Sequence, residues 1–153
     1  DSRSQSMRYL LDTNICIHII NNRIEGSAAW IKSVGIENAL ISSITVAELE
    51  YGIAKSSQYE KTQQALYKFL SGFEIINFDM SCAQFYGVLR ADLQRKGSPI
   101  GNMDMLIAAT ALAQNLTLVT NNINEFNRVD NLSIEDWVTS PPKQALILAW
   151  HSP

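Results

Sequence analysis

Acidic and amide side chains stand in four short segments of the chain, at points where strands or helices are expected to begin or end. These side chains belong to Asp12, Glu48, Asp104 and Asn122. Carboxylate and amide oxygens without nearby histidine or paired cysteine favour hard divalent cations such as Mg²⁺ or Mn²⁺, which are the usual partners of phosphate chemistry. The pattern therefore predicts a divalent-metal site assembled from distant parts of one α/β domain, with a metal nuclease as the leading interpretation.

The composition predicts a single globular domain. The chain has 153 residues, of which 46% are hydrophobic and 18% are charged, and this length suits one core better than two. No segment approaches the roughly 20 consecutive apolar residues that a membrane helix needs. Cys16 and Cys82 lie far apart and lack the spacing of metal ligands. We therefore expect a soluble, cytoplasmic protein with reduced thiols and no membrane association.

The formal net charge of the chain is −3, which disfavours binding to nucleic acid unless positive charge is concentrated locally. Phosphate groups are normally bound by lysine and arginine, although divalent cations can reverse the field around a carboxylate cluster. A local basic face is therefore still needed. The candidates are Lys55, Lys61 and Lys68 in one part of the chain and Arg90, Arg95 and Lys96 in another, with solvated surface charges as the alternative interpretation of each.

Both ends of the chain differ in character from its middle. Residues 1–6 precede Met7 and have neither the apolar stretch nor the cleavage pattern of a secretory signal, so we interpret them as an expression scar. Residues 7–138 form the predicted domain. Residues 139–153 lose regular periodicity apart from one apolar run, and we interpret them as a non-native or flexible tail, with a natural docking arm as the alternative.

Strand-like and helix-like segments alternate along the predicted domain. Strands are expected at residues 7–11, 39–43, 73–78, 116–120 and 132–134, and helices at residues 15–20, from 45 onward, and at 58–71, 81–95 and 104–113. Such alternation predicts an α/β fold with a parallel sheet of four or five strands and helices on both faces.

The candidate ligands occupy the positions at which such folds bind ligands. In open parallel sheets the binding crevice lies beyond the carboxyl ends of the strands. Asp12 follows the first strand, Asn122 follows a later one, and Asp104 opens an apolar helix. If the strands at 7–11 and 116–120 are neighbours, these three residues converge, and Glu48 reaches in from the adjoining connection.

Purely structural roles remain open for several of these residues. Thr13 or Asn14 can cap the helix at 15–20, which leaves Asp12 unexplained by capping. Thr45 and Glu48 match a Ser/Thr-x-x-Glu capping box, so Glu48 could serve the helix start, the metal, or both. Asp104 could simply complement the positive end of the helix dipole.

Four motifs in this order resemble the PIN-domain ribonucleases, specifically the VapC toxins of prokaryotic toxin–antitoxin pairs. The motifs are Leu-Leu-Asp-Thr-Asn at residues 10–14, the segment from Ile44 to Gly52, the segment from Arg95 to Ala109, and Leu-Val-Thr-Asn-Asn-Ile-Asn-Glu-Phe at residues 118–126. The resemblance runs from about Met7 to Trp137.

This resemblance implies a PIN-like parallel sheet between helices, Mg²⁺ or Mn²⁺ as cofactor, endonucleolytic cleavage of RNA with transfer RNA as one candidate, homodimerisation, and inhibition by a cognate VapB-like antitoxin. By motif, Asp12, Glu48 and Asp104 are the catalytic acids and metal ligands. The fourth acid of the family falls at Asn122, an amide here, which puts a second metal in doubt and leaves Asn122 an assisting role. Glu125 is a nearby acid that could partly substitute, with helix capping or surface exposure as equal alternatives.

The neighbouring residues Thr13, Asn14 and Thr120 are candidates for substrate binding. The expected chemistry is hydrolysis by metal-activated water, leaving a 5′-phosphate and a 3′-hydroxyl without a covalent protein intermediate. One alternative is a non-catalytic RNA- or antitoxin-binding PIN-like domain. Another is a phosphatase with Asp12 as nucleophile, which is disfavoured because residues 102–113 contain no lysine.

Overall fold

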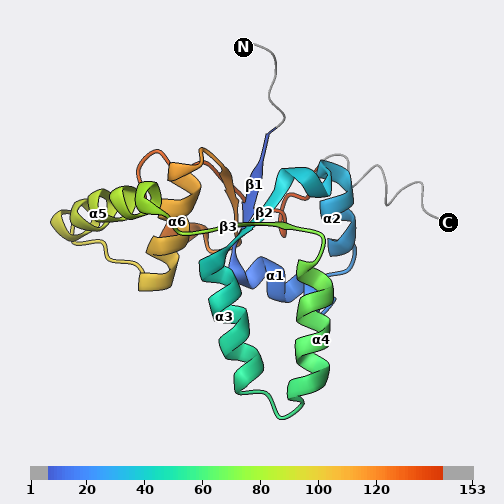
Figure 1. Ribbon diagram of the computed structural model, residues 1–153. Coiled ribbons are helices and arrows are strands. Elements are labelled where there is room, and N and C mark those ends of the chain that lie inside the picture. The colour runs from blue at the N-terminus through green and yellow to red at the C-terminus, as the bar shows by residue number, and fades with distance from the viewer. Residues whose placement is uncertain (1–6, 143–153) are drawn as a thin grey trace.

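A single parallel sheet forms the centre of the computed structural model, which describes residues 7–142 (Figure 1). Its strands are β1 (Tyr9–Leu11), β2 (Ala39–Ser42), β3 (Glu74–Ile76), β4 (Thr117–Val119) and β5 (Ile134–Glu135). The strand order is β3-β2-β1-β4-β5, and each neighbouring pair is parallel. The expected α/β class and strand number are confirmed. From β1 the chain order runs outward in both directions, through β2 and β3 on one side and through β4 and β5 on the other. Parallel sheets bind ligands at such a reversal point, so the predicted crevice lies beside β1.

Helices cover both faces of this sheet. They are α1 (Thr13–Ile20), α2 (Ser27–Val34), α3 (Ser43–Ala54), α4 (Tyr59–Leu70), α5 (Met80–Arg95), α6 (Asn102–Ala113) and α7 (Ile123–Phe126), with the short 3-10 turn η1 (Ile36–Asn38) before β2. In Figure 1, α5 and α6 lie on one side of the sheet and α1 and α2 on the other, while α3 and α4 extend together as an arm. The carboxyl ends of the strands therefore open between these helical groups.

The alternation of side chains along each strand divides the core into two layers. Leu10, Leu40 and Leu118 face the core shared with α5 and α6, whereas Leu11, Ile41 and Val119 face the core shared with α1 to α4. All six are fully buried. Because helices cover both faces of the sheet, the strand sequences are continuous apolar runs and do not alternate between apolar and polar residues.

Most expected elements are present, with shifted ends. The first strand begins at Tyr9 rather than at residue 7, and the last strand is Ile134–Glu135 rather than residues 132–134. The sequence interpretation did not include α2, η1 and α7. Helix α2 is held by Trp30, which packs edge-on against the fully buried Trp137 at a centroid distance of 6.2 Å, a contact across the whole domain that no local pattern reveals.

Several further expectations can be compared with the described residues. Cys16 and Cys82 are buried free thiols, as expected. Within residues 7–142, no helix has the length and apolar character needed to cross a membrane. The interpretations of residues 1–6 as an expression scar and of most of residues 139–153 as a tail concern segments that lie outside the described residues.

Candidate active site

Asp12 stands at the junction between β1 and α1. Its backbone N–H donates to the Val119 carbonyl at 3.0 Å, and its Oδ1 accepts from the Ile15 backbone N–H at 2.8 Å. Asp12 is therefore the N-cap of α1, and the expectation that Thr13 or Asn14 caps this helix is wrong. The reason is that the strand passes into the helix without a loop, so the first extended residue after the strand takes the cap.

Glu48 lies in the second turn of α3. The N-cap of this helix is Ser42, whose Oγ accepts from the Thr45 backbone N–H at 3.0 Å. The capping-box alternative for Thr45 and Glu48 is therefore excluded, because the N-cap lies three residues before Thr45. Glu48 does not cap the helix. Its Oε1 accepts from the Thr13 hydroxyl at 2.6 Å, and this hydrogen bond joins α3 to α1.

Asp104 lies half-buried in the first turn of α6. Burial raises the pKa of its carboxyl to about 7, and a hydrogen bond with Glu125 together with the charges of Glu125, Asp12 and Glu48 adds to the rise. These charges act at short range, so the three predicted acids converge on one region at the carboxyl end of the sheet.

The electrostatics of Asp12 lead to the same conclusion. Only 4% of this residue is exposed, and burial raises the pKa of its carboxyl to about 6 against the opposing hydrogen bonds from Thr120 and the Ile15 amide. The charges of Glu48 and Asp136 raise the pKa further. Burial therefore outweighs the two hydrogen bonds that favour the charged form of Asp12.

Glu125 supplies the fourth acidic group, and Asn122 holds it in place. The Asn122 side chain donates through Nδ2 to Glu125 Oε2 at 2.8 Å, and its backbone N–H donates to the Thr120 hydroxyl at 2.9 Å. The hydrogen bond with Asp104 lowers the pKa of Glu125 while raising that of Asp104. Of the two carboxyls, Asp104 therefore keeps its proton to the higher pH.

The three residues proposed to bind substrate have different surroundings. Thr13 is occupied with Glu48. Thr120 is fully buried, contacts Asp12 and accepts from Asn122. Asn14 is exposed in the first turn of α1. The two threonines therefore orient the acidic side chains, and only Asn14 faces solvent freely.

Sequence reasoning missed Thr45 and Asp136 at this site. Asp136 directly follows β5, so the rule that singled out Asp12 after β1 would also have found Asp136 had the last strand been placed correctly. Thr45 is fully buried beside Thr13. No sequence pattern distinguishes its role from helix capping.

The acidic groups fit a hard cation by their chemistry. Among the salt bridges of the described residues, none involves Asp12, Glu48 or Asp104, so their charge has no basic partner there. As the side chains stand, however, no three histidine, cysteine, aspartate or glutamate side chains of residues 7–142 are grouped closely enough to hold an ion. Asp12 is turned to the Ile15 amide, Glu48 to Thr13, and Asp104 to Glu125.

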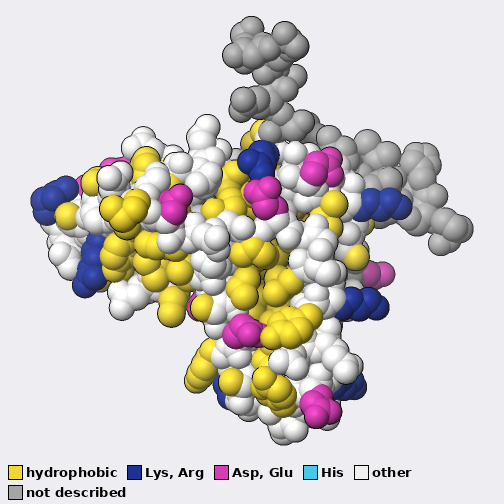
Figure 2. All heavy atoms as spheres, viewed as in Figure 1, with side chains coloured by type: hydrophobic (Ala, Val, Ile, Leu, Met, Phe, Trp, Pro, Cys, Tyr) yellow, Lys and Arg dark blue, Asp and Glu magenta, His cyan; other side chains and the backbone are white. Residues whose placement is uncertain are grey.

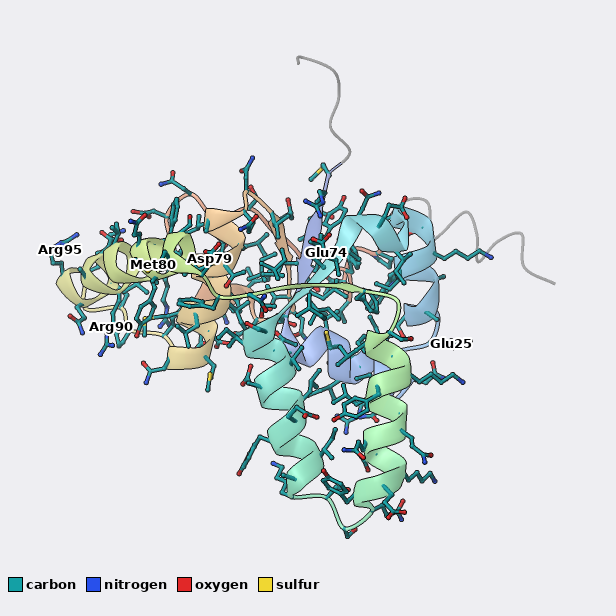
Figure 3. The ribbon with its side chains drawn as sticks, in the orientation of Figure 1. Glu25, Glu74, Asp79, Met80, Arg90 and Arg95 are labelled. Atoms are coloured by element: carbon teal, nitrogen blue, oxygen red, sulfur yellow. The ribbon has the colours of Figure 1, made fainter. Side chains whose placement is uncertain are left out.

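A cavity of about 340 Å³ lies beside Glu48, between α1, α3 and α4. Its walls are largely apolar, with Leu49, Ile53 and Leu66 among them, and Lys61 stands at its border. The basic residues Arg90 and Arg95 project instead from the helix α5 (Figure 3). On another side of the acidic groups, the charge of Arg128 helps to lower the pKa of Glu125.

Comparison with known proteins adds an independent finding. Residues 9–132 match the PIN domain. The chain is 48% identical over 132 residues to Ribonuclease VapC2 of Rickettsia felis, covering 86% of this chain and 98% of that protein. It is 39% identical over 131 residues to the tRNA(fMet)-specific endonuclease VapC of Salmonella typhimurium, with 86% and 98% covered.

Solved structures show the same relationship. The crystal structure of VapBC2 from Rickettsia felis bound to a promoter DNA fragment superposes with a TM-score of 0.80 at 47% identity, covering 86% of this chain and 99% of that one. The DNA-bound VapBC structure from Salmonella typhimurium gives a TM-score of 0.82 at 39% identity, with 86% and 98% covered. The chain therefore belongs to the PIN-domain family, and within it to the VapC group.

Proposed function

We propose that this protein is an endoribonuclease toxin that hydrolyses RNA phosphodiester bonds with the help of Mg²⁺ or Mn²⁺. The observation that carries the proposal is the convergence of Asp12, Glu48 and Asp104, from three separate elements, without a basic partner among the described residues. An uncompensated carboxylate as buried as that of Asp12 is costly for a fold. A bound divalent cation offsets that cost, which is why such clusters are typical of metal sites.

Asp12, Glu48 and Asp104 would hold the cation, with Glu125 and Asn122 assisting. When bound, a divalent cation lowers the pKa of a water molecule and stabilises charge on the reacting phosphate. The residues of the chain supply orientation. The Ile15 amide and Thr120 hold Asp12, Thr13 holds Glu48, and Asn122 holds Glu125 against Asp104.

RNA is the proposed substrate class, and the named relatives indicate which RNA to test first. Two of them are called tRNA(fMet)-specific endonucleases, so transfer RNA is the first candidate. Asn14, which is exposed at the start of α1, and Lys61, which lines the cavity beside Glu48, are candidates for contacting its backbone. The enzyme would act in the cytoplasm, where its substrate lies.

A cognate VapB-like antitoxin is the proposed partner, because the similar solved structures are VapBC complexes. A homodimer is also proposed. Helix α5 presents the exposed apolar side chains Met80, Phe85 and Val88, and hydrophobic atoms gather over this part of the surface in Figure 2. Val88→Glu places a charge on this face, and sedimentation experiments on the variant would test whether the face forms the dimer interface.

The decisive experiment incubates the purified protein with total RNA and with transfer RNA, in Mg²⁺ or in EDTA, and sequences the ends. We expect discrete cuts that require Mg²⁺ and leave 5′-phosphates. Asp104→Asn should abolish them, whereas Asp92→Asn is the control, since Asp92 pairs with Lys96 on the surface of α5. Cleavage that persists in EDTA or in the Asp104 variant would refute the proposal, and RNA binding without any cleavage would establish the non-catalytic alternative.

A further inference from the structure

A row of hydroxyl groups leads from the end of β2 to the carboxylate of Glu48. The Ser42 and Thr45 hydroxyls are 3.3 Å apart, those of Thr45 and Thr13 are 3.1 Å apart, and Thr13 reaches Glu48 Oε1 at 2.6 Å. Ser42 and Thr45 are fully buried. The row therefore crosses from the sheet through α3 to α1 and ends at a catalytic acid.

Thr13 is the donor at the end of this row. A carboxylate only accepts, so the Thr13 hydroxyl donates to Glu48 Oε1. The same hydroxyl lies within donating distance of Thr45 Oγ1. Thr45 Oγ1 also accepts from the Ser42 hydroxyl, and the Ser42 oxygen accepts from the Thr45 backbone amide at 3.0 Å.

The hydrogen bond from Thr13 to Glu48 is charge-assisted, and it is also the shortest in the row. The anchor of the row is fixed, because Ser42 is both a strand residue paired with Ile76 of β3 and the N-cap of α3. If the two threonines only filled space, their methyl groups would be sufficient. Their hydroxyl oxygens instead lie between the N-cap Ser42 and the carboxylate of Glu48.

We propose that Thr13, supported by Thr45, is a positioning residue that presents the Glu48 carboxylate to the metal. This inference rests on the proposed function. Groups that hydrogen-bond a metal ligand orient it and restrict its rotamers, and their removal typically weakens metal binding or activity by about 10- to 100-fold. The Glu48 side chain borders a cavity, so loss of the Thr13 hydrogen bond would free it to turn in that direction.

The test measures Mn²⁺ affinity by calorimetry on the full chain without RNA, and cleavage of transfer RNA separately. Thr13→Val keeps the shape and removes the hydroxyl, and we expect about tenfold weaker Mn²⁺ binding and a similar fall in kcat with KM for RNA unchanged. Thr13→Ser should restore both. Thr45→Val should act in the same direction by about threefold, since it removes only a hydroxyl that helps to hold Thr13.

Thr110→Val is the control, because Thr110 is as buried as Thr45 but donates to the Leu106 carbonyl within α6 at 2.9 Å. It should leave Mn²⁺ affinity unchanged even if the melting temperature falls. Wild-type affinity and cleavage in Thr13→Val would overturn the positioning role alone, as would a failure of serine to rescue. Absence of Mn²⁺ binding and cleavage in the wild type would instead overturn the proposed function and this inference with it.

Discussion

Replacing Asp12 with asparagine should stabilise the protein in the absence of metal, although it removes a proposed ligand. Burial raises the pKa of this carboxyl from 3.8 to about 6, which corresponds to about 3 kcal/mol at 1.36 kcal/mol per pKa unit. Asparagine is an equally good N-cap and can still accept from the Ile15 amide. Loss of the favourable charge at the helix start costs about 0.3–1 kcal/mol, so the net gain should be about 2 kcal/mol at neutral pH.

The pH dependence follows from the direction of the pKa change. Because the folded pKa of Asp12 lies above the unfolded value, the folded state binds more protons between pH 3.8 and about 6. Stability therefore falls as the pH rises through this window, and the cost of the buried charge is fully present above it. Asp104, with its pKa raised to about 7, acts in the same direction at somewhat higher pH. The gain from Asp12→Asn should accordingly be large at pH 8 and small at pH 4.5.

Urea denaturation in EDTA at these two pH values measures the effect, and Asp79→Asn provides the control. Asp79 caps α5 in the same way, accepting from the Cys82 amide at 3.0 Å, and it lies at the start of α5 (Figure 3). Its own hydrogen bonds with Cys82 lower its pKa, so its replacement should not stabilise the protein at pH 8. Addition of Mn²⁺ should reverse the order of wild type and the Asp12 variant.

The reasoning would be refuted if Asp12→Asn were less stable than the wild type in EDTA at pH 8. A gain of equal size at both pH values would also contradict it, because the charge would then not be the cause. The same experiment shows whether the acidic groups are retained at the expense of stability, as is common at functional sites.

Three further predictions concern other parts of the molecule. Glu125→Gln should lower the pKa of Asp104, because it removes the adjacent negative charge, and carboxyl NMR titration in EDTA would contradict this if the pKa stayed near 7. Ser42→Ala should destabilise the fold by about 1 kcal/mol through loss of the cap on Thr45, measured by urea denaturation; an unchanged midpoint would count against that role. Trp137→Ala should cost about 3–5 kcal/mol because this side chain is fully buried, and a melting temperature within a degree or two of the wild type would disprove its importance for the domain.

The site residues could be named from the sequence because their signals are local. Asp12 follows an apolar run, Asp104 opens an apolar helix, and the motif around Glu48 stands where a strand passes into a helix. The alternation of strands and helices likewise predicted a parallel sheet. What the local signals did not provide was the exact start of each helix, so the expected cap of α1 was wrong and the capping-box alternative for Glu48 stayed open.

The start of α3 shows why. Both Ser42 and Thr45 have side chains suited to an N-cap, and the local pattern favoured Thr45 with Glu48. The pairing of β2 with β3 holds Ser42 as the last strand residue opposite Ile76, so the helix begins directly after it. Sheet register, which depends on residues more than thirty positions away, therefore decided that Glu48 was free for the site.

The sequence by itself determined the types of the functional groups, their order along the chain and the class of fold, since these depend on apolar periodicity and on short motifs. Only the tertiary structure decided which groups meet. It joined Thr13 to Glu48 and Glu125 to Asp104, and it gave Asn122 the task of holding Glu125. The physical reason is that hydrogen bonds and charge interactions act over a few ångströms in space, and chain packing alone sets which distant residues come within that range.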